Sequence, residues 1–232
     1  MTEDAVPVDD VEVTRRLFAD ADTLLLDFDG PICSVFAHLP AHHIAQQLKN
    51  VLIDDGRVEL PPEIAKTDDP FDVLRHAATL GRREAEFVES TLRAHEVEAA
   101  TTAIPTAGTK QLMEEWHRAG RKIGIVSNNS TQAISVFTAF HGYAHIHVSA
   151  RTFSDPTLLK PSPHLVVNAL EVLEASPATT LLIGDSTTDQ EAARAAGVGF
   201  IGYANKPSKI AAFSAVSTLI VLTDLRSATG LI

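Results

Sequence analysis

The sequence predicts an α/β protein, in which a parallel sheet is flanked by helices and a small α-helical domain is inserted into that core. Short apolar segments of strand length recur along the chain and alternate with segments of helical periodicity. Several of the apolar segments lack polar alternation, which is typical of strands buried on both faces. About 80 residues after the first predicted strand contain helical patterns and no obvious strand.

Strands and helices are expected to alternate through the core. In the helical segment 108–119, Leu112, Met113 and Trp116 recur at helical spacing and Gly120 follows as a typical C-terminal residue. Strands that alternate with helices of this length predict a parallel sheet, in which the connections are right-handed crossovers. The predicted strands are 23–27, 122–127, 145–149, 180–184, 199–202 and, with the weakest pattern, 219–222; the predicted helices between them are 108–119, 130–140, 163–173 and 186–196.

The inserted domain is predicted from three helical patterns at 37–52, 70–80 and 82–99. We therefore expect a catalytic core made of residues 1–33 and 105–232, and a helical domain over residues 34–104.

Composition excludes several classes of protein. The 232 residues include 19 lysines and arginines against 30 carboxylates, a formal charge of −11. This charge argues against a partner that is a nucleic acid or an anionic membrane, but not against a small phosphate bound in a local pocket. The single cysteine, Cys33, excludes an intramolecular disulfide. The acidic N-terminal segment has no signal-peptide pattern and no apolar run is long enough to span a bilayer, so we expect a cytoplasmic protein.

Carboxylates follow two of the predicted strands. Asp27 and Asp29 lie two residues apart, so an extended backbone directs both to one side. Asp185 and Asp189 follow the strand 180–184. Because ligands of parallel sheets bind outside the carboxyl ends of the strands, we expect these groups to converge. Several hard oxygen donors at one point favour Mg²⁺. Asp189 alone also fits a helix cap, because Ser186-x-x-Asp189 resembles a capping box.

Three further polar residues are expected at the same edge of the sheet. Ser127 and Asn128 follow the apolar run IGIV, and Lys160 lies between two leucines and Pro161 at the start of a helix. If the predicted topology is right, these groups converge with the carboxylates on one rim of the sheet.

In this order, the motifs resemble those of the haloacid dehalogenase (HAD) superfamily, and most closely its phosphoglycolate-phosphatase-like members. Asp27-Phe28-Asp29-Gly30 is similar to the first motif, Ser127 with Asn128 to the second, Lys160-Pro161 to the third and Gly184–Asp189 to the GDxxxD form of the fourth. The resemblance covers about residues 23–190. It implies a Rossmann-like core, and the helical insertion resembles the C1 cap of the family.

The resemblance also implies a mechanism for each matching position. Asp27 would be the nucleophile that forms an aspartyl-phosphate, and Asp29 the general acid and base. Mg²⁺ would be bound by Asp27, the Asp29 carbonyl, Asp185 and Asp189, while Ser127, Asn128 and Lys160 would bind the phosphate. The chain would thus be a Mg²⁺-dependent phosphatase of a small phosphorylated metabolite, acting as a monomer or homodimer. Dehalogenation is not expected, because true dehalogenases lack the counterpart of Asp29.

The first motif departs from the family pattern at one position. The threonine that usually follows Asp-x-Asp-Gly is replaced by Pro31, which provides neither a hydroxyl nor a backbone N–H. We therefore expect altered substrate handling in the loop after Asp29.

Two alternative functions stay open. A sugar-phosphate mutase of the same superfamily would return the phosphoryl group to its substrate. A phospho-accepting regulatory homologue, or an inactive subunit that binds a partner, would show no turnover.

Overall fold

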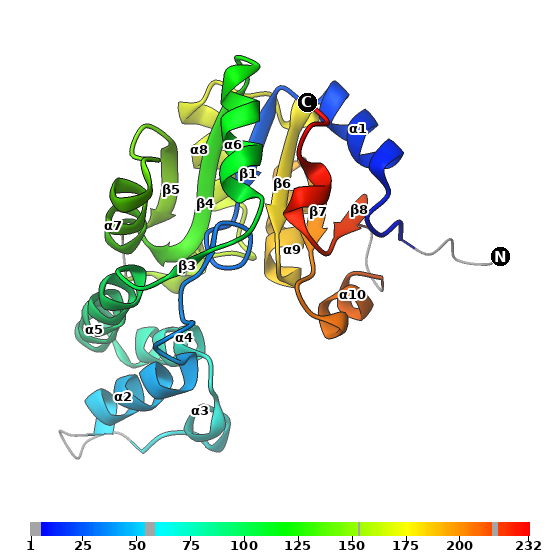
Figure 1. Ribbon diagram of the computed structural model, residues 1–232. Coiled ribbons are helices and arrows are strands. Elements are labelled where there is room, and N and C mark those ends of the chain that lie inside the picture. Colours follow the sequence, from blue (N-terminus) through cyan, green and yellow to red (C-terminus); the bar gives the residue numbers. More distant parts are fainter. Residues whose placement is uncertain (1–5, 54–58, 153, 215–217) are drawn as a thin grey trace.

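The computed structural model describes residues 6–53, 59–152, 154–214 and 218–232. Its centre is a six-stranded sheet with the strand order β5-β4-β1-β6-β7-β8, in which every neighbouring pair is parallel (Figure 1). The expected α/β architecture is confirmed. The strands of this sheet are β1 (Thr23–Leu26), β4 (Lys122–Ser130), β5 (His147–Arg151), β6 (Thr180–Gly184), β7 (Gly199–Tyr203) and β8 (Ile220–Leu222).

Helices cover both faces of this sheet. The side chains of β1 alternate between the two faces, so each face contributes apolar groups to a different core. Leu24 and Leu26 pack with one set of helices and Leu25 with the other. The first set contains α1 (Val11–Asp20), α6 (Thr109–Arg118), α7 (Thr131–His141) and the 3₁₀ turn Leu225–Ala228; the second contains α8 (His164–Val172), α9 (Thr187–Ala196) and α10 (Pro207–Ser214). Two further 3₁₀ turns are Pro156–Leu158 and Pro177–Thr179.

In the described residues, four helices lie between β1 and α6 in the sequence and gather beyond one end of the sheet, where α5 also packs against α7 and β4 (Figure 1). They are α2 (Ala41–Ile53), α3 (Pro62–Lys66), α4 (Pro70–Leu80) and α5 (Arg82–Ala100). A two-stranded antiparallel sheet of β2 (Cys33–Ser34) and β3 (Ile104–Pro105) joins the two ends of this segment. The sequence showed no obvious strand in this stretch, because two-residue strands leave no periodic pattern. The division into two domains at 34 and 104 stays a prediction.

Most predicted bounds in the core lie within one residue of the structure, and the larger differences occur at two strands. β4 continues to Ser130 instead of ending at residue 127, and β5 begins at His147 instead of residue 145. The helix expected from residue 163 begins at His164, with Pro163 as its N-cap residue. Helices α1, α3 and α10 were not predicted, since their apolar patterns are short. In the described residues, no helix is both long and apolar enough to cross a membrane.

We predict that Leu24→Ala in β1 destabilises the protein by about 2–5 kcal/mol, because the fully buried side chain leaves a cavity in the central strand. Urea unfolding followed by circular dichroism would measure the loss. Val167→Ala on α8 is the control, since its side chain is 38% exposed and we expect a change within about 0.5 kcal/mol. Equal losses in the two variants would contradict the central position of β1.

Candidate active site

The centre of the candidate site is the ammonium group of Lys160, which lies among acceptors from three separate parts of the chain. Its Nζ donates to Asp27 Oδ1 at 2.8 Å, to the Val126 carbonyl at 3.1 Å and to Asp189 Oδ1. The lysine is 2% exposed. The end of β1, the middle of β4 and the first turn of α9 thus meet at one buried cation.

The charges of this cluster affect one another strongly. Burial, and then the negative charge of Asp189, raise the pKa of Asp27 above its usual range. Burial alone would lower the pKa of Lys160, but Asp189 and Asp27 outweigh this effect and raise it. The single ammonium group of Lys160 thus contacts two buried carboxyl groups.

Asp185 is the third carboxylate of the cluster. Asp27, Asp185 and Asp189 each offer an oxygen, and these oxygens lie within 4.8 Å of one another. Gly30 allows this approach, because a Cβ at its position would lie 2.4 Å from Asp185 Oδ2 and its φ of +110° favours glycine. Such hard oxygen donors fit a divalent cation. Lys209 of α10, which the sequence patterns did not indicate, forms an ion pair with Asp185.

The two carboxylate oxygens of Asp189 have different partners. Its Oδ1 binds Lys160, while its Oδ2 accepts the backbone N–H of Ser186 at 3.0 Å and that of Asp185 at 3.2 Å. The predicted capping box at the start of α9 is present. The cap holds Asp189 in place beside Lys160. Capping of α9 by Asp189 is therefore compatible with its place in the carboxylate cluster.

Asp29 lies at the start of a tight loop after β1. Its Oδ1 accepts the backbone N–H of Val35 at 3.0 Å, and burial raises its pKa to about 6. Phe28, between the two aspartates, is fully buried and packs edge-on against Phe137 with a centroid distance of 5.3 Å. The buried phenylalanine anchors the backbone from which Asp27 and Asp29 extend.

The loop at Pro31 is held by hydroxyl groups from elsewhere in the chain. Thr106 Oγ1 donates to the Gly30 carbonyl at 2.6 Å, and Thr109 Oγ1 donates to the Pro31 carbonyl. The sequence lacks a threonine at position 31, but two threonines around the start of α6 hydrogen-bond to the loop. The loop is therefore tied to the core even though Pro31 cannot donate a hydrogen bond.

Ser127 and Asn128 lie in the last part of β4, and their side chains make different contacts. Asn128 Oδ1 accepts the Lys160 N–H at 2.8 Å, and its Nδ2 donates to the Lys160 carbonyl at 3.1 Å. Ser127 Oγ donates to Asn129 Oδ1 at 3.2 Å. The Asn128 side chain thus fixes the backbone of Lys160.

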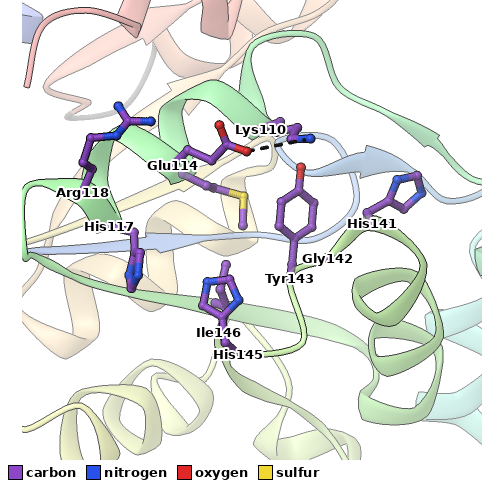
Figure 2. A pocket seen from close by; sticks show the side chains of 10 residues that line it. Lys110, Glu114, His117, Arg118, His141, Gly142, Tyr143, His145 and Ile146 are labelled. Atoms are coloured by element: carbon purple, nitrogen blue, oxygen red, sulfur yellow. Dashed lines mark ion pairs between the residues drawn. The ribbon is translucent and has the colours of Figure 1, made fainter.

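A surface cavity of about 420 Å³ lies at the opposite edge of the sheet. It is lined by α6, the end of α7 and the segment before β5, and it includes His117, His141 and His145 (Figure 2). The starts of β4 and β5 lie there, whereas the carboxylate cluster lies at the strand ends. None of the predicted site residues lines this cavity.

The family model described as haloacid dehalogenase-like hydrolase matches residues 65–203, which is more than half of the chain. The chain belongs to this family. The matched range begins after Asp29 and includes Ser127, Lys160, Asp185 and Asp189.

Two relatives are named as phosphatases. The chain is 28% identical to a phosphoglycolate phosphatase from Aquifex aeolicus (strain VF5), over 87% of this chain and 96% of that protein. It is 27% identical to the pyrophosphatase PpaX from Bacillus mycoides (strain KBAB4), over 72% of this chain and 76% of that protein. These relatives confirm the expected resemblance to phosphoglycolate phosphatases and the expected enzyme class, a phosphatase of this family.

Solved structures confirm the expected fold. CbbY from Rhodobacter sphaeroides in complex with phosphate superposes with a TM-score of 0.64 at 16% identity, over 89% of this chain and 95% of that chain. A hydrolase from Pseudomonas syringae superposes with a TM-score of 0.65 at 16% identity, over 88% of this chain and 94% of that chain. At these identities the likeness concerns the fold.

We predict that Asp185→Asn weakens the binding of Mg²⁺ by about tenfold or more, because a neutral amide oxygen is a poorer ligand than a carboxylate. Isothermal titration calorimetry with MgCl₂ would measure the affinity. Asp224→Asn is the matched control, since Asp224 pairs with Arg226 outside the cluster. Unchanged affinity in the Asp185 variant would show that the cluster does not bind the ion.

Proposed function

We propose that this protein is a Mg²⁺-dependent phosphatase that hydrolyses a small phosphorylated metabolite through an aspartyl-phosphate. The observation that carries the proposal is the contact of Lys160 with Asp27 in a buried site, next to two further carboxylates. A carboxylate that is held in a fixed orientation beside a cation is suited to nucleophilic attack on a phosphoryl group.

In this proposal Asp27 attacks phosphorus, and the bond from phosphorus to the leaving oxygen breaks. Asp29 gives its proton to that oxygen, and the product alcohol leaves. Asp29 then takes a proton from a water molecule, whose oxygen attacks the phosphorus of the aspartyl-phosphate. Inorganic phosphate is released and the Asp27 carboxylate is restored. The bond from the Val35 N–H supports this role, because it fixes the direction of the Asp29 carboxyl.

The phosphate would be bound by Lys160, the Ser127 hydroxyl and the N–H groups that follow Ser127. Mg²⁺ would be held by Asp27, the Asp29 carbonyl, Asp185 and Asp189, and when bound it would offset the repulsion between these carboxylates and the phosphate. Asp185 would exchange its ion pair with Lys209 for the metal ion. Asp189 can contribute while it still caps α9, since a carboxylate oxygen has two lone pairs.

The names of the relatives narrow the class of substrate to be tested. One relative is named for phosphoglycolate and another for pyrophosphate, and both substrates are small and strongly anionic. We propose 2-phosphoglycolate and pyrophosphate as first candidates.

We predict that the wild-type protein releases inorganic phosphate from p-nitrophenyl phosphate with Mg²⁺, and that Asp27→Asn lowers kcat by about 10³-fold or more, since the nucleophile is lost. Asp22→Asn is the control, because Asp22 is exposed at the other end of the same strand. In a separate single-turnover experiment with a sugar phosphate, an isomerised product instead of inorganic phosphate would support the mutase. Stoichiometric phosphorylation without turnover would support the regulatory homologue.

We predict that removal of divalent ions with EDTA abolishes this turnover and that excess Mg²⁺ restores it, because the carboxylate cluster then repels the substrate. Circular dichroism before and after EDTA would show an intact fold. Turnover that persists in EDTA would contradict the metal dependence.

A further inference from the structure

A second buried cluster of charges joins α5 to the ends of β4 and β5. Arg151, the last residue of β5, has a fully buried side chain and binds Glu89 and Glu96 of α5. Its Nη1 lies 2.6 Å from Glu89 Oε1, and its Nη2 donates to Glu96 Oε2. Arg93 lies 3.7 Å from the other oxygen of Glu89.

Stability alone does not explain this cluster. Burial removes three charged groups from water, and the attraction between the buried partners offsets this desolvation penalty only in part. Apolar residues of similar volume in the same place often give a protein of equal or greater stability. The position of the cluster is more informative. It lies where the inserted helices contact the strand ends that carry the candidate site.

The contacts of Glu96 lead to the segment that begins at Ser127. Glu96 Oε2 accepts the Ser130 N–H at 2.9 Å, and Oε1 accepts Asn129 Nδ2 at 3.2 Å. Asn129 is buried, and its Oδ1 accepts the hydroxyl of Ser127 at 3.2 Å. Because Glu96 binds the Nδ2 side of this amide, the Oδ1 side faces Ser127.

Arg151 holds the same segment from another direction. Its Nε donates to the Asn128 carbonyl at 3.0 Å, while Glu96 fixes the two residues that follow. The guanidinium also lies over the ring of Phe71 of α4, 6.0 Å from the centroid. Two of the inserted helices therefore contact the residues that hold the segment 127–130.

We propose that Glu96, held in place by Arg151, is a positioning residue for phosphate binding. This inference rests on the proposed phosphatase function, since it concerns how the Ser127 hydroxyl reaches the phosphate. Glu96 fixes Asn129, and Asn129 holds the Ser127 hydroxyl until a phosphate oxygen replaces its Oδ1 as acceptor. The bond to Ser130 fixes the backbone N–H groups of the same segment.

Glu89 provides a matched control for Glu96. Each glutamate is a partner of Arg151 on the same helix, and Ala at either position leaves the arginine with one carboxylate. The contacts described for Glu89 are with Arg151 and Arg93, whereas Glu96 also binds the segment 127–130. A purely structural role predicts similar effects of the two substitutions.

The test compares Glu96→Ala and Glu89→Ala in p-nitrophenyl phosphate hydrolysis and in the binding of inorganic phosphate by the Mg²⁺-loaded protein. For Glu96→Ala we expect KM and the Kd of phosphate to rise about tenfold, with a smaller change in kcat, because charged hydrogen bonds that position the ligand are lost. For Glu89→Ala we expect both constants within about twofold of wild type. Glu96→Gln should recover only part of the loss, since its one amide oxygen can accept from Asn129 or from Ser130 but its amide nitrogen then faces the other donor.

Asn129→Ala keeps every charge and gives a second test if Glu96→Ala does not fold. It should raise KM and the phosphate Kd as Glu96→Ala does. Equal effects of Glu96→Ala and Glu89→Ala, or a normal phosphate Kd in Asn129→Ala, would overturn the positioning role while wild-type turnover still supports the phosphatase. A wild-type protein that neither hydrolyses the ester nor binds phosphate would overturn both proposals.

Discussion

The buried ammonium of Lys160 determines how the other groups of the site are placed. A lysine that is cut off from water needs anionic or carbonyl partners, and this one finds them in Asp27, Asp189 and the Val126 carbonyl. These partners come from β1, α9 and β4, which are far apart in the sequence. Any shift of one of these elements would leave a buried charge incompletely paired, so the lysine fixes their relative positions.

The balance of charge around Lys160 is the reason why the proposed phosphatase would need a further cation to bind an anionic substrate. Three carboxylates face two ammonium groups, those of Lys160 and Lys209. A phosphate that entered this cluster would meet an excess of negative charge. In the proposed function, a divalent ion in the same place would offset that excess. The overall charge of −11, which repels large polyanions, therefore does not conflict with local binding of a small phosphate.

The sequence was sufficient to predict the sheet and the convergence of the strand ends. Asp27, Ser127 and Asp185 each follow an apolar run, and a parallel sheet brings the ends of such runs together. Lys209 was missed because its partner is 24 residues away and depends on the placement of α10. Glu96 was missed because its partner Arg151 is 55 residues away, although two buried glutamates among the apolar residues of α5 were a usable signal. Arg151 is the last residue of β5, two residues beyond the predicted end of that strand, so the strand-end rule pointed close to it.

The length of β4 shows why local patterns could not define this site completely. The residues from Ser127 to Ser130 are polar and have no apolar alternation, so the sequence predicts that the strand ends at residue 127. The segment remains extended because its hydrogen-bonding groups are paired by side chains of α5 and β5, with Glu96 bound to Ser130 and Arg151 bound to Asn128. Extended backbone at this point is thus a property of the assembled protein. The inserted helices, which follow β1 in the sequence, complete a strand that the core alone would leave partly unpaired, and in this way a segment outside the sheet takes part in shaping its catalytic edge.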